Sequence, residues 1–230
     1  MISIYPGFYR ESLTITKRLT LHGESPDRVI LQGARPGRPV ISIWTSEPGN
    51  LIGIALEQDT PITVTLENLQ IQGAYWYYSE VECAVYSSTI CPDGIAVRGR
   101  ASVTMRNLWV HDNRDNGISL GLNVQATIQN CAIWDNGDDG IHAWLDTEVA
   151  VLGSTISGNE ADGINLQSRY QVFSWLSIGG PVQATIIGNS ITENEGYGIE
   201  AQSGNEVVSC YGNVIQGNEQ GSYRVGSEEE

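Results

Sequence analysis

Apolar and polar residues alternate in short bursts along most of the chain. One representative stretch has three apolar pairs: Ala126 and Ile128, Cys131 and Ile133, then Ile141 and Ala143. Bursts this short with a period of two predict β-strands, because successive side chains of a strand point to opposite faces. A helical repeat would need apolar residues at the 3.6-residue spacing over ten or more positions, and no such stretch is present. The pattern predicts an all-β chain.

A Gly-Ile pair returns at a constant interval, at Gly94-Ile95, Gly117-Ile118, Gly140-Ile141, Gly163-Ile164 and Gly198-Ile199. The glycines are 23, 23, 23 and 35 residues apart, so one period carries an insertion of 12 residues. An asparagine column has the same period, at Asn113, Asn136, Asn159, Asn194 and Asn218. Three strands in each period predict one triangular coil. Coils stacked about 4.8 Å apart would pair equivalent strands in parallel and align the asparagines into an amide ladder.

The Asn-x-x-x-Gly-Ile coils resemble those of the right-handed parallel β-helix, or pectin-lyase-like, superfamily. The opening residues 4–13 and 15–23 are similar to the first coil of many bacterial β-helix proteins and of pectin methylesterases. The resemblance implies a single-stranded right-handed parallel β-helix of about eight coils with three strands each. We expect one domain, 1–230, with irregular coils over 1–60, regular coils over 62–226, and loop insertions near 74–93 and 169–180.

Charge and composition exclude several classes of partner. The chain has 27 acidic and 12 basic residues, and its net charge of −15 opposes binding to nucleic acid and to anionic membranes. No apolar run approaches the roughly 20 residues of a membrane span. The amino-terminal residues lack the basic region and the apolar run of an export signal. The superfamily resemblance nevertheless favours an extracellular or periplasmic location.

The four cysteines do not form a metal-binding motif, because no Cys-x-x-Cys pair occurs. Cys83 and Cys91 are close in sequence, and both a disulfide bond and two free thiols fit that spacing. Cys131 and Cys210 stand in apolar alternating stretches, which predicts that they are small core residues.

Two insertions rich in aromatic residues are expected to flank the third strand of the coils. The first contains Tyr75, Trp76, Tyr77, Tyr78 and Tyr86, and the second contains Tyr170, Phe173 and Trp175. Aromatic faces suit stacking on sugar rings, but they also fold onto a rod as packing. If the insertions form walls, the floor of a groove is the outward face of the third strands: Arg98, Ser119, His142, Trp144, Asn165, Gln167, Glu200 and Gln202. Polar residues are expected on any solvated strand face, so a purely structural role stays open.

Acidic residues gather at the turn that leads into the third strand. The column geometry places Asp139 and Asp162 about 4.8 Å apart, so that one is protonated near neutral pH or both share a cation such as calcium. We predict Asp138, Asp139 and Asp162 as acid-base residues, with His142 as proton shuttle or substrate donor. The alternative is that Asp-Gly pairs occur here because they favour tight turns.

The acidic coils around Gly137-Asp138-Asp139-Gly140 and Asp162-Gly163 resemble those of β-helix polygalacturonases. The two coils come in the reverse order, and neither Gly-His-Gly nor Arg-x-Lys follows, so no specific enzyme family is matched. The predicted substrate-binding residues are Trp144, Asn165, Gln167, Glu200, Tyr78 and Trp76.

The predicted function is engagement of a polysaccharide, with neutral chains favoured over acidic ones because of the net charge. The catalytic version is a lyase, hydrolase or epimerase that uses the acid-base carboxylates, and calcium is the one cofactor considered. The alternative is a noncatalytic glycan-binding or structural solenoid that forms oligomers or larger assemblies through uncapped ends.

Overall fold

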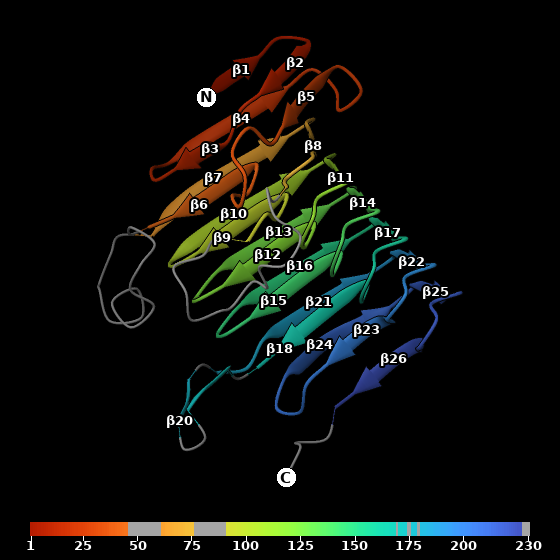
Figure 1. The fold of residues 1–230 in the computed structure, drawn as a ribbon. Helices are drawn as coiled ribbons and strands as arrows, with labels where there is room; N and C mark the ends of the chain where they lie inside the picture. The colour runs from red at the N-terminus through yellow and green to blue at the C-terminus, as the bar shows by residue number, and fades with distance from the viewer. Residues whose placement is uncertain (46–60, 76–90, 169, 174–175, 179, 227–230) are drawn as a thin grey trace.

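The computed structural model describes residues 1–45, 61–75, 91–168, 170–173, 176–178 and 180–226. Three parallel sheets of eight strands each wind around one axis (Figure 1). The predicted right-handed β-helix of about eight coils is confirmed. No helix in the described part of the chain is long and apolar enough to cross a membrane.

The first strand of each coil lies in sheet A, the second in sheet B and the third in sheet C. Sheet A contains β1 (Ile2–Ile4), β4 (Leu19–Gly23), β7 (Ile62–Glu67), β10 (Ala101–Arg106), β13 (Gln125–Gln129), β16 (Glu148–Leu152), β21 (Gln183–Ile187) and β24 (Glu206–Tyr211). Sheet B contains β2 (Gly7–Arg10), β5 (Val29–Gln32), β8 (Gln70–Gln72), β11 (Trp109–His111), β14 (Ala132–Trp134), β17 (Thr155–Ser157), β22 (Ser190–Thr192) and β25 (Val214–Gln216). Sheet C contains β3 (Leu13–Ile15), β6 (Ile41–Trp44), β9 (Ile95–Arg98), β12 (Ile118–Gly121), β15 (Ile141–Trp144), β18 (Ile164–Gln167), β23 (Tyr197–Ala201) and β26 (Gly221–Val225).

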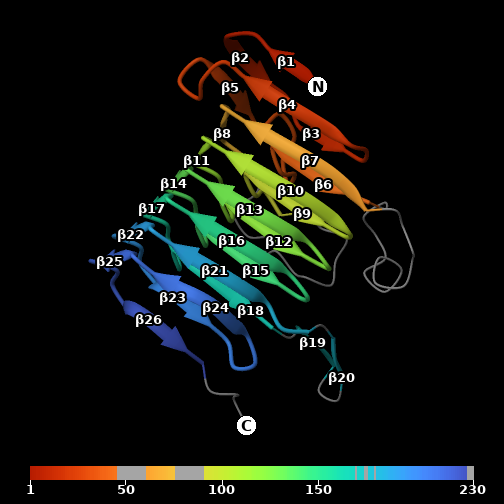
Figure 2. The same ribbon diagram turned by 180° about the vertical axis from the view of Figure 1, so that it is seen from behind.

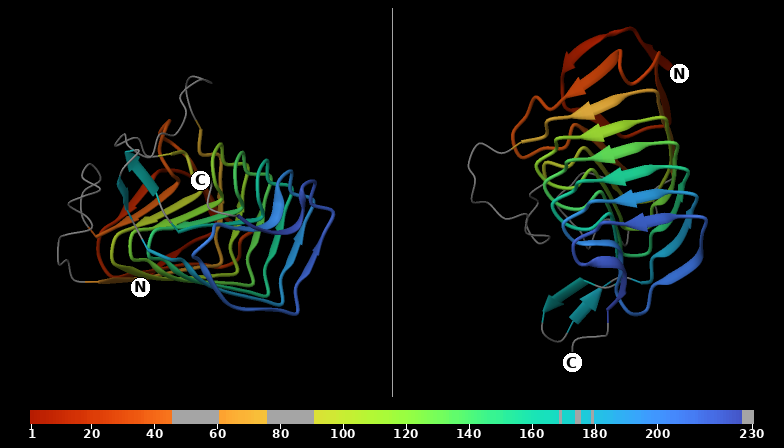
Figure 3. Two further views of the ribbon diagram at one scale, coloured as in Figure 1. Left: turned by 90° about the horizontal axis from the view of Figure 1, so that it is seen from below. Right: turned by 90° about the vertical axis from the view of Figure 1, so that its right-hand side faces the viewer.

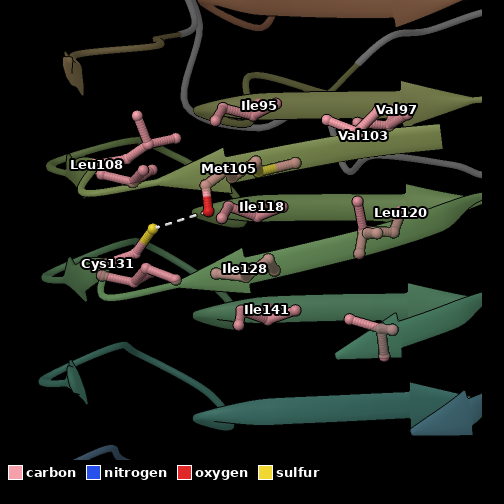
Figure 4. Close-up of a cluster of buried hydrophobic side chains, with 14 of the residues drawn as sticks. Ile95, Val97, Val103, Met105, Leu108, Ile118, Leu120, Ile128, Cys131 and Ile141 are labelled. Atoms are coloured by element: carbon pink, nitrogen blue, oxygen red, sulfur yellow. Dashed lines mark hydrogen bonds between the residues drawn. The ribbon is translucent and has the colours of Figure 1, made fainter. Parts of the chain in front are cut away.

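The strand register reproduces the 23-residue period of the sequence. Ile118 pairs with Ile95 on one side and with Ile141 on the other, and Ile141 pairs with Ile164. All four isoleucines are fully buried, and Ile95, Ile118 and Ile141 stand above one another in the core (Figure 4). The coils therefore follow one another along the axis in register (Figure 3).

The 12 additional residues of the long period contain an antiparallel hairpin made of β19 (Tyr170–Phe173) and β20 (Leu176–Ile178). The hairpin projects from the rod between β18 and β21 (Figure 2). Sheet A continues past it without a shift, because Glu148 pairs with Gln183 and Leu152 pairs with Ile187. The insertion thus leaves the columns of the neighbouring coils aligned.

The asparagine ladder is present at the turn between sheets B and C. The Asn113 side-chain amide donates to Asn136 at 3.0 Å, Asn136 donates to Asn159 at 2.9 Å, and Asn159 donates to Asn194 at 2.8 Å. Each Oδ1 also accepts the backbone N–H of the asparagine in the preceding coil, as in the 3.2 Å bond from Asn136 to Asn159. The ladder satisfies polar groups that the stacked turns bury.

The repeated glycine follows from the close approach of successive coils. A Cβ at Gly140 would lie 2.7 Å from the carbonyl oxygen of Gly163 and 2.8 Å from the side-chain nitrogen of Asn159. Both contacts are shorter than van der Waals distances allow, so any side chain would separate the coils. The turn between sheets A and B has a different requirement, because Asn107 and Asn130 have φ values of 49° and 52°, a region that asparagine tolerates.

The prediction of a core position is confirmed for Cys131 and wrong for Cys210, and of the pair Cys83 and Cys91 the structure describes only Cys91. Cys131 is buried, as predicted, whereas Cys210 is exposed. Cys210 does pair with the buried Ile186, but it lies in β24, beyond which sheet A has no further strand among the described residues. Cys91 is disulfide-bonded, and Cys83 lies outside the described residues.

Candidate active site

An open cleft of about 450 Å³ lies where the turn from sheet B enters sheet C. Four successive coils line it, through β15, β18, β23, the turns that precede these strands, and Gln220 in the turn before β26. The lining consists of Asp138, Asp139, His142, Glu160, Ala161, Asp162, Asn165, Gln167, Gly196, Glu200, Gln202 and Gln220. All four predicted catalytic residues, and three of the predicted substrate-binding residues, therefore meet in one place.

A second ladder runs beside the asparagine ladder and holds two of the acids. The backbone N–H of Asp139 donates to Asn116 Oδ1 at 3.2 Å, and the N–H of Asp162 donates to Asp139 Oδ1 at 2.9 Å. The N–H of Tyr197 donates to Asp162 Oδ1 at 2.6 Å. Asp139 and Asp162 are 3% and 5% exposed, so the two aspartates lie in successive coils of one column and both are buried.

Burial raises the pKa of all three aspartates of the cleft. The pKa of Asp162 is raised to about 7, first by burial and then by its hydrogen bond with Glu200. The pKa of Asp138 is raised to about 6 by burial and by the charges of Asp115 and Glu160. The pKa of Asp139 is raised well above its usual value by burial and by the charge of Asp138. Near neutral pH the cleft thus offers both protonated and ionised carboxyl groups.

His142 stands beside these acids with one ring nitrogen in a hydrogen bond. Its Nε2 lies 3.1 Å from Gln167 Oε1, and because that oxygen only accepts, Nε2 carries the proton. Its Nδ1 lies 3.9 Å from Asp139 Oδ2. The side chain is 22% exposed, and burial lowers the pKa of His142 to about 4. The imidazole is therefore neutral at pH 7, with a lone pair on Nδ1.

Amide groups and one ion pair complete the cleft. Asn165 Nδ2 donates to Asp162 Oδ2 at 3.3 Å. Glu200 forms an ion pair with Arg224, at 3.1 Å between Oε1 and Nη1, so its charge is balanced. Gln167 and Gln202 line the same wall. Side-chain amides of this kind donate to and accept from hydroxyl groups.

One predicted aromatic contact lies elsewhere, and the other two fall outside the described residues. Trp144 is 7% exposed, and the guanidinium of Arg98 covers its ring at 4.9 Å from the centroid. The indole occupies the space beside Gly121, where a Cβ would come within 2.4 Å of it. The structure therefore does not bring Trp144 to the cleft. Tyr78 and Trp76 lie outside the described residues.

Asp93 is a buried acid that the sequence reasoning did not select. It is 1% exposed, and Asn116 Nδ2 donates to its Oδ1 at 3.1 Å. Its Oδ2 has no hydrogen-bond partner and lies 3.9 Å from Arg98 Nη2. Burial, followed by the charge of Asp115, raises the pKa of Asp93 well above its usual value. Its position 23 residues before Asn116 was the available signal, because it places Asp93 in the same column as Asp139 and Asp162.

The described residues contain no group of three or more His, Cys, Asp or Glu arranged to hold a metal ion. The hydrogen bonds of Asp139 and Asp162 run instead to backbone N–H groups and to Asn165. The sharing of a calcium ion by these two acids stays a prediction.

Comparisons with known proteins identify the architecture. A family model described as "right handed beta helix region" matches residues 52–229. The A-module of a mannuronan C-5 epimerase from Azotobacter vinelandii superposes with a TM-score of 0.56 at 14% identity, over 97% of this chain and 63% of that one. A pectin methylesterase from Yersinia enterocolitica has a TM-score of 0.49 at 11% identity, over 85% of this chain and 75% of that one. No curated protein sequence matches. The likeness to the epimerase module, at 14% identity, shows a shared fold alone and leaves the reaction to be argued from the site.

Proposed function

We propose, from the premise that this chain belongs to the right-handed β-helix family, that its sheet C cleft binds a carbohydrate chain and acts on it by acid-base catalysis. One observation carries the proposal: three aspartates with raised pKa and a neutral histidine line a single open cleft. Groups that exchange protons near neutral pH cluster at functional sites, because catalysis needs both an acid and a base there.

Hydrolysis of a glycosidic bond uses this arrangement most directly. Asp162, whose pKa is about 7, gives its proton to the oxygen of the leaving sugar as the bond to the anomeric carbon breaks. Asp138, whose pKa is about 6, is mostly ionised at pH 7 and takes a proton from the water that adds to the anomeric carbon. Proton exchange with solvent then restores both groups.

The electrostatics of the cleft favour a neutral glycan over a polyuronate. The lining residues include five acids but neither Lys nor Arg, and Arg224 nearby is paired with Glu200. Epimerisation or elimination at a uronate would require a positive group to stabilise the substrate carboxylate. A neutral sugar needs hydroxyl partners instead, which Asn165, Gln167 and Gln202 supply.

Noncatalytic glycan binding is the second candidate, because the amides of the cleft would hold a sugar whether or not the acids transfer protons. The two candidates differ in product formation. Neutral polysaccharides such as xylan, mannan and β-glucan are incubated with the protein, with alginate and polygalacturonate as anionic comparators, with and without calcium. Binding and new reducing ends are measured separately.

The key variant is Asp162→Asn, which keeps an oxygen to accept the Tyr197 N–H. The same column already contains an asparagine, Asn116, which accepts the N–H of Asp139 through its Oδ1. We expect turnover to fall by at least about a hundredfold. The control is Glu195→Gln, an exposed acid in the turn before β23 that does not line the cleft, with turnover unchanged.

The outcomes separate the candidates. Binding of a neutral glycan with no product from any polymer would reject catalysis and leave the binding function. Product from polyuronates alone would reject neutral-glycan hydrolysis. Absence of both binding and product for every polymer would reject a carbohydrate role for the cleft.

A further inference from the structure

The outward face of sheet B is uncharged over six consecutive coils, in a protein with a net charge of −15. The strands β8, β11, β14, β17, β22 and β25 each present two outward residues, and none is Asp, Glu, Lys or Arg. The register aligns them in two columns: Gln70, Trp109, Ala132, Thr155, Ser190 and Val214, and beside these Gln72, His111, Trp134, Ser157, Thr192 and Gln216. A ligand on this face meets amides, hydroxyls and aromatic rings.

Two tryptophans stand near the middle of this face. Trp109 is 38% exposed, and its indole meets that of Trp134 edge to face, with 6.1 Å between ring centroids and 73° between ring planes. The other exposed large apolar side chains among the described residues lie in the first coil or the last one. Trp109 is therefore an exception in the body of the rod, where apolar exposure has a cost.

Neighbouring side chains hold the aromatic pair in place. The imidazole of His111 stacks on Trp134 at 4.2 Å with 11° between the planes. Gln70 Nε2 donates to His111 Nε2 at 2.9 Å, which leaves the ring proton on Nδ1, facing Asp112 Oδ2 at 2.6 Å. The ring orientation is thus fixed from both sides, so a ligand would find the Trp134 indole already ordered.

The next coil leaves space beside each indole. Ala132 pairs with Trp109, and Ser157 pairs with Trp134, so a small residue follows each large one along its column. Beyond Ala132 stands Thr155, which is exposed. The result is an aromatic corner with hydroxyl and amide groups around it.

We infer that Trp109 and Trp134 form a second carbohydrate-binding surface, separate from the cleft, that takes a neutral glycan. The apolar face of a pyranose ring would stack on an indole, and Gln72, Thr155 and Ser157 would bond its hydroxyls. Asp112 and Asp135 lie one residue beyond the face in the adjoining turn, so an anionic polymer is disfavoured. We name this surface the sheet B platform; it stands on observations independent of the cleft chemistry.

The test is a depletion assay with insoluble cellulose, chitin, xylan and mannan, together with tryptophan fluorescence for soluble fragments. We expect Trp109→Ala to weaken binding about tenfold, the effect of losing one well-packed aromatic contact, and Trp109→Phe to weaken it less. Tyr211→Ala, at a 64% exposed aromatic residue of β24 in sheet A, is the matched control with unchanged binding. Thermal unfolding of each variant verifies the fold.

Asp162→Asn separates this surface from the cleft. Binding that survives Asp162→Asn and is lost in Trp109→Ala supports the sheet B platform, even if no polymer is ever cleaved. Binding unaffected by Trp109→Ala, or lost only in Asp162→Asn, overturns it. So does failure of the wild-type protein to bind any of the four polymers, or a wild-type dimer that Trp109→Ala dissociates, since a second copy would then cover the face.

Discussion

Replacing Asn136 by alanine tests whether the asparagine ladder holds the coils together. Asn136 is fully buried, and its Oδ1 accepts both the side-chain amide of Asn113 at 3.0 Å and the backbone N–H of Asn113 at 3.3 Å. Its own amide donates to Asn159 Oδ1 at 2.9 Å. Alanine removes these three bonds and also the 3.4 Å bond that the Asn136 amide donates to the carbonyl oxygen of Val110.

The expected magnitude follows from the groups left without partners. Two buried donors of Asn113 lose their acceptor, and each buried unsatisfied group costs about 1–3 kcal/mol. Asn159 Oδ1 loses one donor but still accepts the backbone N–H of residue 136 at 3.2 Å, so its cost is small. We therefore expect Asn136→Ala to lower the free energy of unfolding by about 2–6 kcal/mol.

The assay is urea unfolding followed by tryptophan fluorescence. The control is Gln125→Ala, which removes an exposed amide bonded to Glu148 at 3.2 Å and should change the unfolding free energy by less than about 0.5 kcal/mol. A loss below about 1 kcal/mol for Asn136→Ala would refute the reasoning, because the ladder would then be replaceable by water or by local rearrangement.

Three further predictions concern packing, protonation and thiol accessibility. Gly140→Ala should lower the melting temperature by several degrees, because its Cβ would meet the backbone of the next coil; an unchanged melting temperature would contradict that close contact. The raised pKa of Asp162 means that the folded state disfavours its ionisation, so its contribution to stability should fall as pH rises from about 4 to 7. Asp162→Asn should flatten this part of a melting-temperature profile, and a profile identical to wild type would contradict the assignment. In the native protein a thiol reagent should label the exposed Cys210 but not Cys131, because Cys131 is buried and burial raises its pKa to about 11. Peptide mass spectrometry would measure the labelling of each cysteine. Equal labelling would contradict the burial of Cys131.

The architecture was predictable because the stack repeats one physical requirement in every coil. The Gly-Ile pair marks a position where the next backbone leaves no room for a Cβ, and the asparagine column marks a buried turn that needs an amide. Both signals have the period of the coil and survive the 12-residue insertion. A single sequence therefore carried the strand register as well as the fold class.

The sequence predicted which residues of the cleft share a column and face outward. It did not predict how the outward side chains pack against one another. Alternation placed Trp144 on the outward face of sheet C, but alternation does not reveal that Arg98 covers the ring. The apolar context of Cys210 resembles that of Cys131, and only the position of its strand at the end of sheet A makes it exposed. Asp93 was not predicted because it falls at the end of the loop insertion expected near 74–93, whereas Asn116, Asp139 and Asp162 of its column stand in uninterrupted coils.

The column that contains Asp139 and Asp162 shows whether the fold itself requires a carboxyl group at these positions. Each position needs one oxygen to accept a backbone N–H from the neighbouring coil, and Asn116 meets that need as well as either aspartate does. Asparagine would meet it without placing an ionisable group where burial raises its pKa. Turn preference does not select between them, because Asn-Gly and Asp-Gly both favour tight turns. The fold therefore accounts for an oxygen at these positions but not for a carboxyl group, and the acids coincide with the open cleft. This is the pattern expected when a site departs from the most stable choice for the sake of its chemistry.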